Sequence, residues 1–186
     1  MTVSKEHVDF CFQVLVAYLK KEPKPEPTFT NDGYPLFVTW HKKTRNGSTL
    51  RGCIGNFQPM SLHEGLARYA LISALQDHRF PPITLSEVPH LECAVSLLVN
   101  FEVAKDYLDW EIGVHGIWIE FYQDGRKETA TYLPEVMGEQ GWTKEEAIES
   151  LLRKGGYRGQ VTKKYCLENI MLTRYRSDKI HGTYKP

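Results

Sequence analysis

The spacing of apolar residues near the N-terminus predicts an amphipathic helix. Apolar side chains recur at intervals of three and four at Val8, Cys11, Phe12, Leu15 and Leu19. Ser4 stands where an N-cap residue is expected. The proline-rich run from Pro23 to Pro27 cannot continue a helix, because proline lacks the backbone N–H and clashes with the preceding turn. We therefore expect a helix from Lys5 to Lys21, followed by a stiff connector.

Alternating patterns predict strands further along the chain. Residues 36–40 alternate as a strand does, and Asn46-Gly47 favours a tight hairpin turn with a return strand from Thr49 to Ile54. Residues 91–103 are apolar on both faces, which is typical of a central strand. A second hairpin is expected from residues 116–122 and 128–133, around Asp124-Gly125.

Two capping boxes predict further helices. Ser61 and Glu64 would open a helix from Leu62 to about Gln76, and Thr143 and Glu146 one that ends near Lys154. Residues 167–176 resemble a last strand. Strands grouped between a few helices indicate an α+β fold with a mainly antiparallel sheet and packed helices. The length of 186 residues suits a single domain spanning residues 1–186.

Composition narrows the function classes. Lys+Arg and Asp+Glu both number 23, so the basic excess typical of nucleic-acid binders is missing and nucleic acid is not the expected partner. No apolar run approaches the roughly 20 residues that span a bilayer, and the N-terminus does not resemble a signal peptide. The four cysteines are widely spaced, which favours thiols in a reducing compartment such as the cytoplasm or nucleus.

The sequence lacks the motifs that usually hold metals and cofactors. It contains no H-E-x-x-H, EF-hand or paired-cysteine spacing, so no metal site is predicted. The phosphate-loop and dinucleotide patterns are also missing, and we expect no cofactor.

The hexapeptide from Leu50 to Gly55 holds the strongest candidate site, which we expect to be a loop. Cys53 stands between two glycines, and Arg51 two positions away would lower the pKa of its thiol. Amides from Gly52 to Asn56 would bind an anion if their N–H groups are available. Cys53 is thus a nucleophile, part of a ligand-binding loop without covalent chemistry, or a small packing residue with Arg51 in a structural ion pair.

A cysteine nucleophile needs a base, and two histidines are candidates. His115 stands between glycines, but it also suits a turn histidine bonded to backbone. His63 begins a helix ten residues after Cys53, so it lies near the thiol or is simply an exposed helix residue. In the cluster from Asp77 to Arg79, Arg79 suits bidentate binding of a carboxylate or phosphate, or an ordinary ion pair at a helix end.

The C-terminal region has a basic stretch with interleaved aromatics, at Arg153, Lys154, Tyr157, Arg158, Lys163, Lys164, Tyr165, Arg174, Tyr175, Arg176 and Lys179. Cations follow phosphates and aromatic rings stack on bases, so a nucleic-acid role is an alternative. A solvated rim around one helix and one strand explains the same pattern.

Several of these segments together resemble the AMMECR family. The hexapeptide Leu50-Arg51-Gly52-Cys53-Ile54-Gly55 is similar to the family signature, and Asp77 with Arg79-Phe80-Pro81-Pro82 is similar to a second motif. Further resemblances follow in the family's order at residues 92–98, 113–117, 131–134 and 154–156, with Gly155 where alanine is commoner. The resemblance spans roughly residues 5–176.

The family resemblance implies a larger and a smaller lobe and an intracellular protein without a settled activity. It also implies a link to Memo-type dioxygenase-like proteins, beside which such chains are often encoded in microbes. We interpret the chain as a regulatory or binding module for a peptide, protein or small anionic ligand. Its expected ligand-binding residues are Arg51, Gly52, Ile54, Gly55, Asn56, Asp77 and Arg79. An enzyme that uses Cys53, with His115 or His63 as base, is the alternative.

Overall fold

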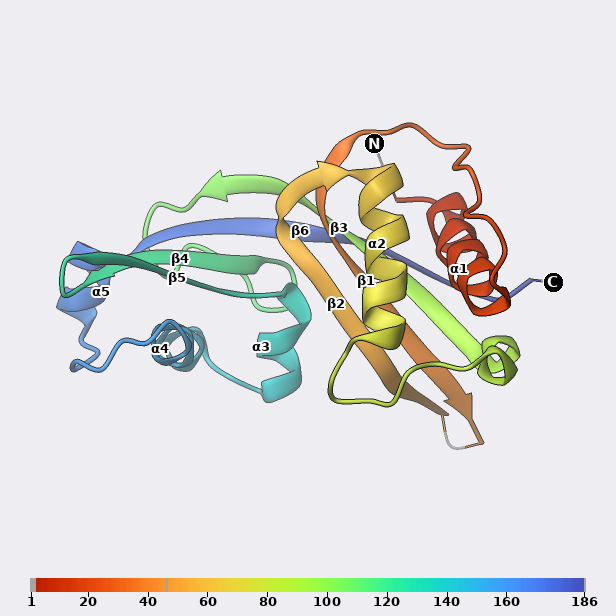
Figure 1. Ribbon diagram of the computed structural model, residues 1–186. Coiled ribbons are helices and arrows are strands. Elements are labelled where there is room, and N and C mark those ends of the chain that lie inside the picture. Colours follow the sequence, from red (N-terminus) through yellow and green to blue (C-terminus); the bar gives the residue numbers. More distant parts are fainter. Residues whose placement is uncertain (1–2, 46, 186) are drawn as a thin grey trace. The chain divides into compact units, whose positions relative to one another are not determined.

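A six-stranded antiparallel sheet runs through the computed structural model, which describes residues 3–45 and 47–185 (Figure 1). The strands are ordered β2-β1-β3-β6-β4-β5, so β2 and β5 are the two edge strands. Their bounds are β1 Gly33–Thr44, β2 Gly47–Ser61, β3 Leu91–Val103, β4 Gly116–Gln123, β5 Arg126–Tyr132 and β6 Met171–Thr183. The α+β prediction with a mainly antiparallel sheet is confirmed.

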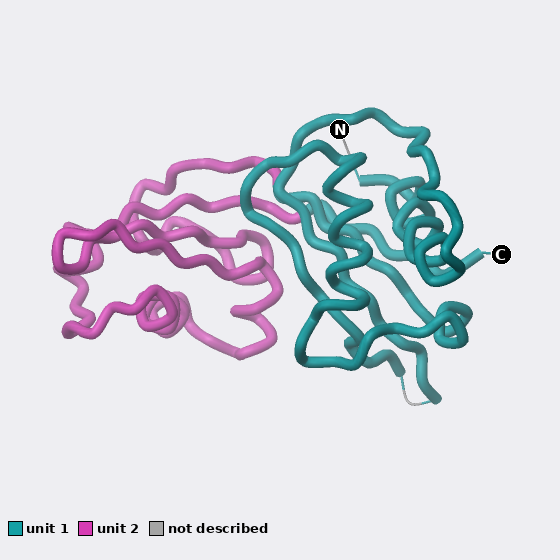
Figure 2. Tube along the Cα trace, viewed as in Figure 1, with its two compact units in different colours: residues 1–98, 178–186 teal, residues 99–177 magenta. Residues whose placement is uncertain are grey.

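The chain divides into two compact units, coloured separately in Figure 2. Unit 1 comprises Met1–Leu98 and Asp178–Pro186, and unit 2 comprises Val99–Ser177. They correspond to the expected larger and smaller lobes. Because β3 and β6 each run from one unit into the other, both units contain four strands or parts of strands.

Both predicted hairpins form. Thr44 of β1 pairs with Gly47 of β2, so Gly47 belongs to the strand, while the predicted turn residue Asn46 lies outside the described residues. The second hairpin turns at Asp124 (φ 51°) and Gly125 (φ 76°). Two consecutive positive φ angles suit the right-handed twist of the flanking strands, which explains the Asp-Gly pair.

In unit 1, two helices build the core together with the strands. Helix α1 (Lys5–Lys20) packs against α2 (Leu62–Leu75), and α2 lies against β1 and β2 (Figure 1). The fully buried Trp40 of β1 links these layers. Its indole N–H donates to the Ala70 carbonyl of α2 at 3.0 Å, and its ring meets that of Phe12 edge-on at 5.0 Å.

The predicted capping box of α2 is wrong, although the helix itself is confirmed. The Ser61 side chain makes no cap bond. Instead, the connector before β1 supplies the acceptors: the Leu62 N–H donates to the Asp32 carbonyl, and the His63 N–H donates to the Asn31 side chain. A tertiary contact therefore satisfies the first amides of the helix, which a local sequence pattern cannot reveal.

In unit 2, the β4–β5 hairpin packs against α3 (Pro134–Gln140) and α4 (Lys144–Lys154) around a separate apolar core. The predicted Thr143–Glu146 capping box is confirmed at the start of α4. The predicted strand from Leu167 is wrong at its start, because residues 163–169 form helix α5 (Lys163–Asn169). The Thr162 hydroxyl accepts the Tyr165 N–H and so begins that helix.

Candidate functional site

The hexapeptide from Leu50 to Gly55 lies within strand β2 and is not the loop that the sequence suggests. Cys53 pairs with Thr39 of β1, and Gly55 pairs with Phe37. The strand continues to Ser61, beyond the end that the sequence predicts at Ile54. One edge of β2 is therefore bonded to β1, and only its outer edge faces away from the sheet.

The two glycines of the signature are explained by close packing of backbone. A Cβ built on Gly52 would lie 1.8 Å from the Ser73 carbonyl oxygen of α2, and one on Gly55 would lie 2.2 Å from the Leu36 carbonyl oxygen of β1. Both distances are far inside van der Waals contact, so only glycine fits. The close approach that we expected of a ligand is thus made by α2 and β1.

Asp77 and Arg79 cover the outer edge of β2 at Cys53. The Cys53 N–H donates to Asp77 Oδ2 at 3.0 Å, and Arg79 Nη2 donates to the Cys53 carbonyl at 3.3 Å. Arg79 is itself held by Asp77 through Nε to Oδ1 at 2.9 Å and Nη2 to Oδ2 at 2.7 Å. This ion pair replaces a neighbouring strand for one residue and brings two separate sequence motifs together.

The electrostatics of this pair fix both charges. The Asp77 side chain is 5% exposed, whereas that of Arg79 is 57% exposed. The pKa of Asp77 is held far below its usual range, chiefly by the hydrogen bonds from the Arg79 side chain, with a smaller contribution from the Cys53 N–H. The pKa of Arg79 is raised, first by the same bonds to Asp77. An ionised, partly exposed guanidinium therefore lies beside Cys53 at every physiological pH.

Cys53 differs from the other three cysteines in exposure. It is half-buried, while Cys11, Cys93 and Cys166 are buried. The Thr39 hydroxyl donates to the Cys53 sulfur at 3.1 Å, across the β1–β2 pair. The Cys53 sulfur therefore accepts a hydrogen bond from the neighbouring strand.

Arg51 forms a structural ion pair, which is one of the alternatives that the sequence left open. Its Nε and Nη2 both donate to the Glu87 carboxylate at 3.1 Å, and Nη1 donates to the Pro81 carbonyl at 2.8 Å. Lys42 also bonds to Glu87 at 3.1 Å. These donors, led by the Arg51 side chain, lower the pKa of Glu87 to about 2. The Arg51 side chain is only 11% exposed and ties β2 to the short helix η1 (Leu85–His90).

Hydrogen bonds of Arg51 and Cys53 to the segment from Asp77 to Pro82 thus join the two segments that resemble the family's signatures. A model of the AMMECR1 family matches residues 8–180. The chain belongs to the AMMECR1 family.

Relatives of this AMMECR1-family chain extend across eukaryotes and archaea. An uncharacterized protein of Arabidopsis thaliana is 49% identical over 95% of this chain and 84% of its own length. One of Schizosaccharomyces pombe is 40% identical over 97% of this chain and 93% of its own. The solved structure of an uncharacterized protein of Pyrococcus horikoshii matches with a TM-score of 0.72 and 25% identity, over 96% of this chain and 90% of that one. The fold is therefore shared, and none of these relatives brings an assigned reaction.

His63, one of the two AMMECR1-family histidines proposed as a base, is bound elsewhere in unit 1. Its Nε2 lies 2.6 Å from the Phe29 carbonyl, and its ring packs edge-on against the Phe29 ring at 5.1 Å. His63 lies in the first turn of α2. Gly52, next to Cys53, lies against Ser73 in the last turn of the same helix. Ten helical residues span about 15 Å. His63 therefore fastens the connector to α2 and is not positioned to take a proton from Cys53.

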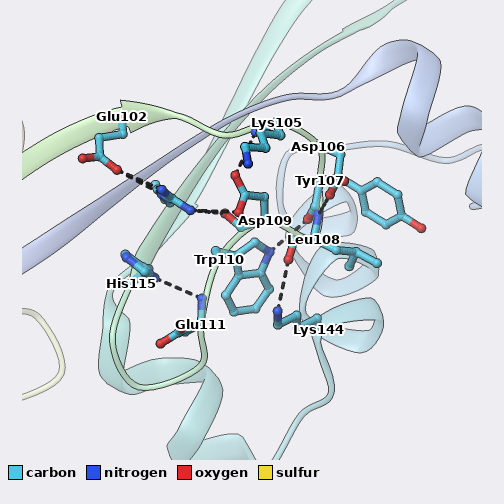
Figure 3. Close-up of polar contacts among 11 residues, drawn as sticks. Glu102, Lys105, Asp106, Tyr107, Leu108, Asp109, Trp110, Glu111, His115 and Lys144 are labelled. Atoms are coloured by element: carbon cyan, nitrogen blue, oxygen red, sulfur yellow. Dashed lines mark hydrogen bonds and ion pairs between the residues drawn. The ribbon is translucent and has the colours of Figure 1, made fainter.

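His115 is a turn histidine of unit 2 (Figure 3). Its Nδ1 accepts the Glu111 N–H at 3.0 Å, and the His115 N–H donates to the Glu111 carbonyl at the same distance. Burial and then the nearby Arg174 and Arg176 lower the pKa of the imidazole, so it is neutral at pH 7. The nitrogen that would act as a base is occupied by a backbone amide.

Ile54 and Asn56 are the remaining residues that the sequence predicts to bind a ligand. Ile54 and Asn56 are half-buried in β2, and the Asn56 side chain accepts the Gln58 N–H at 3.0 Å. The sequence does not reveal two residues that contact the signature, Glu87 and Thr39. Both lie far from the signature in sequence, and no local motif marks them as partners of Arg51 and Cys53.

The basic C-terminal stretch is largely engaged within unit 2. Arg174 donates to the carboxylates of Glu102 and Asp109, and Arg153 donates to two backbone carbonyls. The interleaved aromatics are packed as well, since Tyr175 is fully buried, while Tyr157 and Tyr165 stack on each other at 4.4 Å. This arrangement resembles the solvated rim more closely than a base-stacking surface.

Within residues 3–45 and 47–185, no three His, Cys, Asp or Glu side chains gather in a way that could hold a metal ion. No helix of that same region has the length and apolar character needed to span a bilayer.

Proposed function

We propose that this AMMECR1-family chain is a regulatory or binding module that holds an anionic group of a peptide, protein or small ligand at Arg79, beside Cys53. The observation that carries the proposal is the shape of the Asp77–Arg79 pair. Asp77 binds Nε and Nη2, which leaves the Nη1 edge of an exposed guanidinium without a hydrogen bond to any other residue of the described chain.

The fixed position of Arg79 favours recognition of a carboxylate or phosphate. Its guanidinium lies over the Phe80 ring at 5.3 Å, so one face is packed while one edge faces outward. A planar fork held in one orientation loses little conformational entropy when it binds an anion. Arg51 lacks this property, because Glu87 and Pro81 take up donors from all three of its nitrogens.

The location at the edge of the sheet favours a peptide as the carrier of the anionic group. The outer edge of β2 pairs with no other strand of the described chain, and Asp77 and Arg79 bond to it at Cys53. Extended peptides commonly add to such edges, with side-chain pockets supplying specificity.

A selection of peptides from a random display library on the immobilised full chain tests the proposal. We expect the wild type to enrich peptides that contain Asp or Glu. Arg79→Lys and Arg79→Gln should bind the selected peptides about tenfold more weakly, because lysine lacks the planar guanidinium that Asp77 holds in one orientation and glutamine also lacks the charge. Arg45→Gln, which changes an exposed arginine of the β1–β2 hairpin, is the matched control.

Two outcomes would overturn the proposal. One is a selection on the wild type that shows no acidic preference. The other is equal binding by the wild type and both Arg79 variants, with thermal unfolding confirming that each variant is folded.

A further inference from the structure

The backbone of β2 at Cys53 and Gly55 determines what its outer edge can bind. In an antiparallel pair, the N–H and carbonyl of one residue point toward the partner strand and those of the next residue point away from it. The Cys53 N–H and carbonyl bond to Asp77 and Arg79, so both point away from β1. The pairing with β1 continues from Cys53 to Gly55 without a register shift. The N–H and carbonyl of Gly55 therefore also point outward.

Gly55 offers a hydrogen-bonding position for an added strand. It is half-buried, so solvent still reaches it, and no other strand of the described chain pairs with the outer edge of β2. An outward N–H and carbonyl on one residue can bond to the carbonyl and N–H of a single residue in an antiparallel strand. Two strand residues span about 7 Å, so this position lies within reach of the Arg79 guanidinium that bonds to the Cys53 carbonyl.

Asp77 and Arg79 close the edge on one side of this position. Because the Cys53 N–H and carbonyl are already bonded, a strand that pairs at Gly55 cannot continue its pairing past Cys53. A longer chain would have to turn away from the edge there, whereas a chain that ends there needs no turn. The end of such a chain lies beside the exposed guanidinium of Arg79. This arrangement favours a chain terminus over an internal segment.

The charge of Arg79 selects which terminus binds. A strand antiparallel to β2 runs from Gly55 toward Cys53 and brings its α-carboxylate to the guanidinium, which attracts it. A parallel strand would bring its α-ammonium to the same cation, and the two like charges would repel each other. Asp77 does not offset this repulsion, because it is nearly buried and already bonded to Arg79 and the Cys53 N–H. The antiparallel direction is therefore favoured.

We propose that the outer edge of β2 binds the free C-terminus of an extended peptide, with its α-carboxylate on Arg79. The penultimate residue of the peptide exchanges hydrogen bonds with Gly55, and the last residue lies opposite Ile54, which brings the carboxylate level with Cys53. This inference rests on the proposed anion site at Arg79 and names the group that fills it. An Asp or Glu side chain carries the same carboxylate chemistry, so the test separates the two sources.

Fluorescence anisotropy of three mixtures of N-terminally labelled octapeptides, titrated with the full chain, tests this proposal. The first mixture lacks Asp and Glu and has free C-termini, and the second is the same mixture with C-terminal amides. The third carries one internal Asp or Glu and ends in an amide. We expect the first to bind about tenfold more tightly than the second, and more tightly than the third. A third mixture that binds as tightly as the first overturns the C-terminal inference but keeps the anion site, whereas binding by none of the three overturns both.

Variants and a spin label test the contact and the direction. Arg79→Gln should bind the free-acid and amide mixtures alike, because the cation that distinguishes them is gone, while the exposed Arg45→Gln should keep the tenfold preference. A nitroxide at the N-terminus of a free-acid peptide should broaden the ¹⁵N amide signal of Gln58 more than that of Ser48, at the two ends of β2. The proposal is overturned if Arg79→Gln keeps the preference for the free acid, or if Ser48 is broadened more than Gln58.

Discussion

At the scale of single residues, Asp77 determines the candidate site. Its carboxylate accepts the Cys53 N–H, the Arg79 N–H and two guanidinium donors, so one nearly buried side chain orders both a strand edge and an exposed cation. For Arg79, the sequence suggested either an ion pair or binding of an anion. The observed contacts are compatible with both roles at once. One side of Arg79 is in the pair and the other faces outward.

Replacing Asp77 by asparagine should make stability less dependent on pH. The folded pKa of Asp77 lies below its unfolded value of about 3.9. Its contribution is therefore present above that unfolded value and is lost as pH falls toward the folded pKa. At pH 7, Asp77→Asn should cost about 1–3 kcal/mol of unfolding free energy. Urea unfolding from pH 7 down to pH 2 should show this difference shrinking below about pH 4.

Asp124→Asn is the matched control, since asparagine also tolerates the left-handed backbone of that exposed turn. A difference between Asp77→Asn and the wild type that stays constant from pH 7 to pH 2 would contradict the assigned ion pair.

At the scale of elements, the packing of α2 on β2 explains most of the signature's composition. Gly52 is required because the α2 backbone at Ser73 occupies the space of a side chain. Long periodic elements such as α1, α2 and β3 were predictable, because one or both of their faces are buried and the pattern repeats. The α5 helix was missed because it is a short segment whose start depends on a single cap at Thr162. The loop assignment of the hexapeptide failed because glycines indicate a close approach without indicating what approaches.

Gly52→Ala should strongly destabilise unit 1. The added methyl would meet the Ser73 carbonyl carbon and oxygen at 2.9 and 1.8 Å, so the helix or the strand must shift. We expect a loss of about 3 kcal/mol, as for severe overpacking. Gly33→Ala, where no atom lies within 4 Å of the added Cβ, should change stability by less than about 0.5 kcal/mol. Chemical denaturation of both variants measures the contrast, and similar stabilities would show that α2 does not pack on β2 as described.

At the scale of the whole molecule, the sequence motifs separate by unit. The hexapeptide and the Asp77–Pro82 segment meet in unit 1, while His115 and the α4 capping box belong to unit 2. The family resemblance located the candidate residues, but pattern alone could not tell which arginine is exposed. Arg51 and Arg79 look alike in sequence, and only the positions of Glu87 and Asp77 decide their roles. The balanced net charge likewise conceals the exposed guanidinium of Arg79.

The alkylation of Cys53 by iodoacetate and by iodoacetamide tests the proposed anion site most directly. The thiolate attacks both reagents and displaces iodide, so the ratio of the two rates cancels the thiolate fraction and reports the attraction of the carboxylate of iodoacetate. The fully buried Cys11 and Cys93 serve as internal controls in peptide mass spectrometry.

We predict that Cys53 reacts in the native protein and that its iodoacetate-to-iodoacetamide ratio falls about threefold or more in Arg79→Gln at low salt. A Cys53 that reacts only after unfolding, or a ratio that Arg79→Gln leaves unchanged, would contradict an accessible anion site at Arg79.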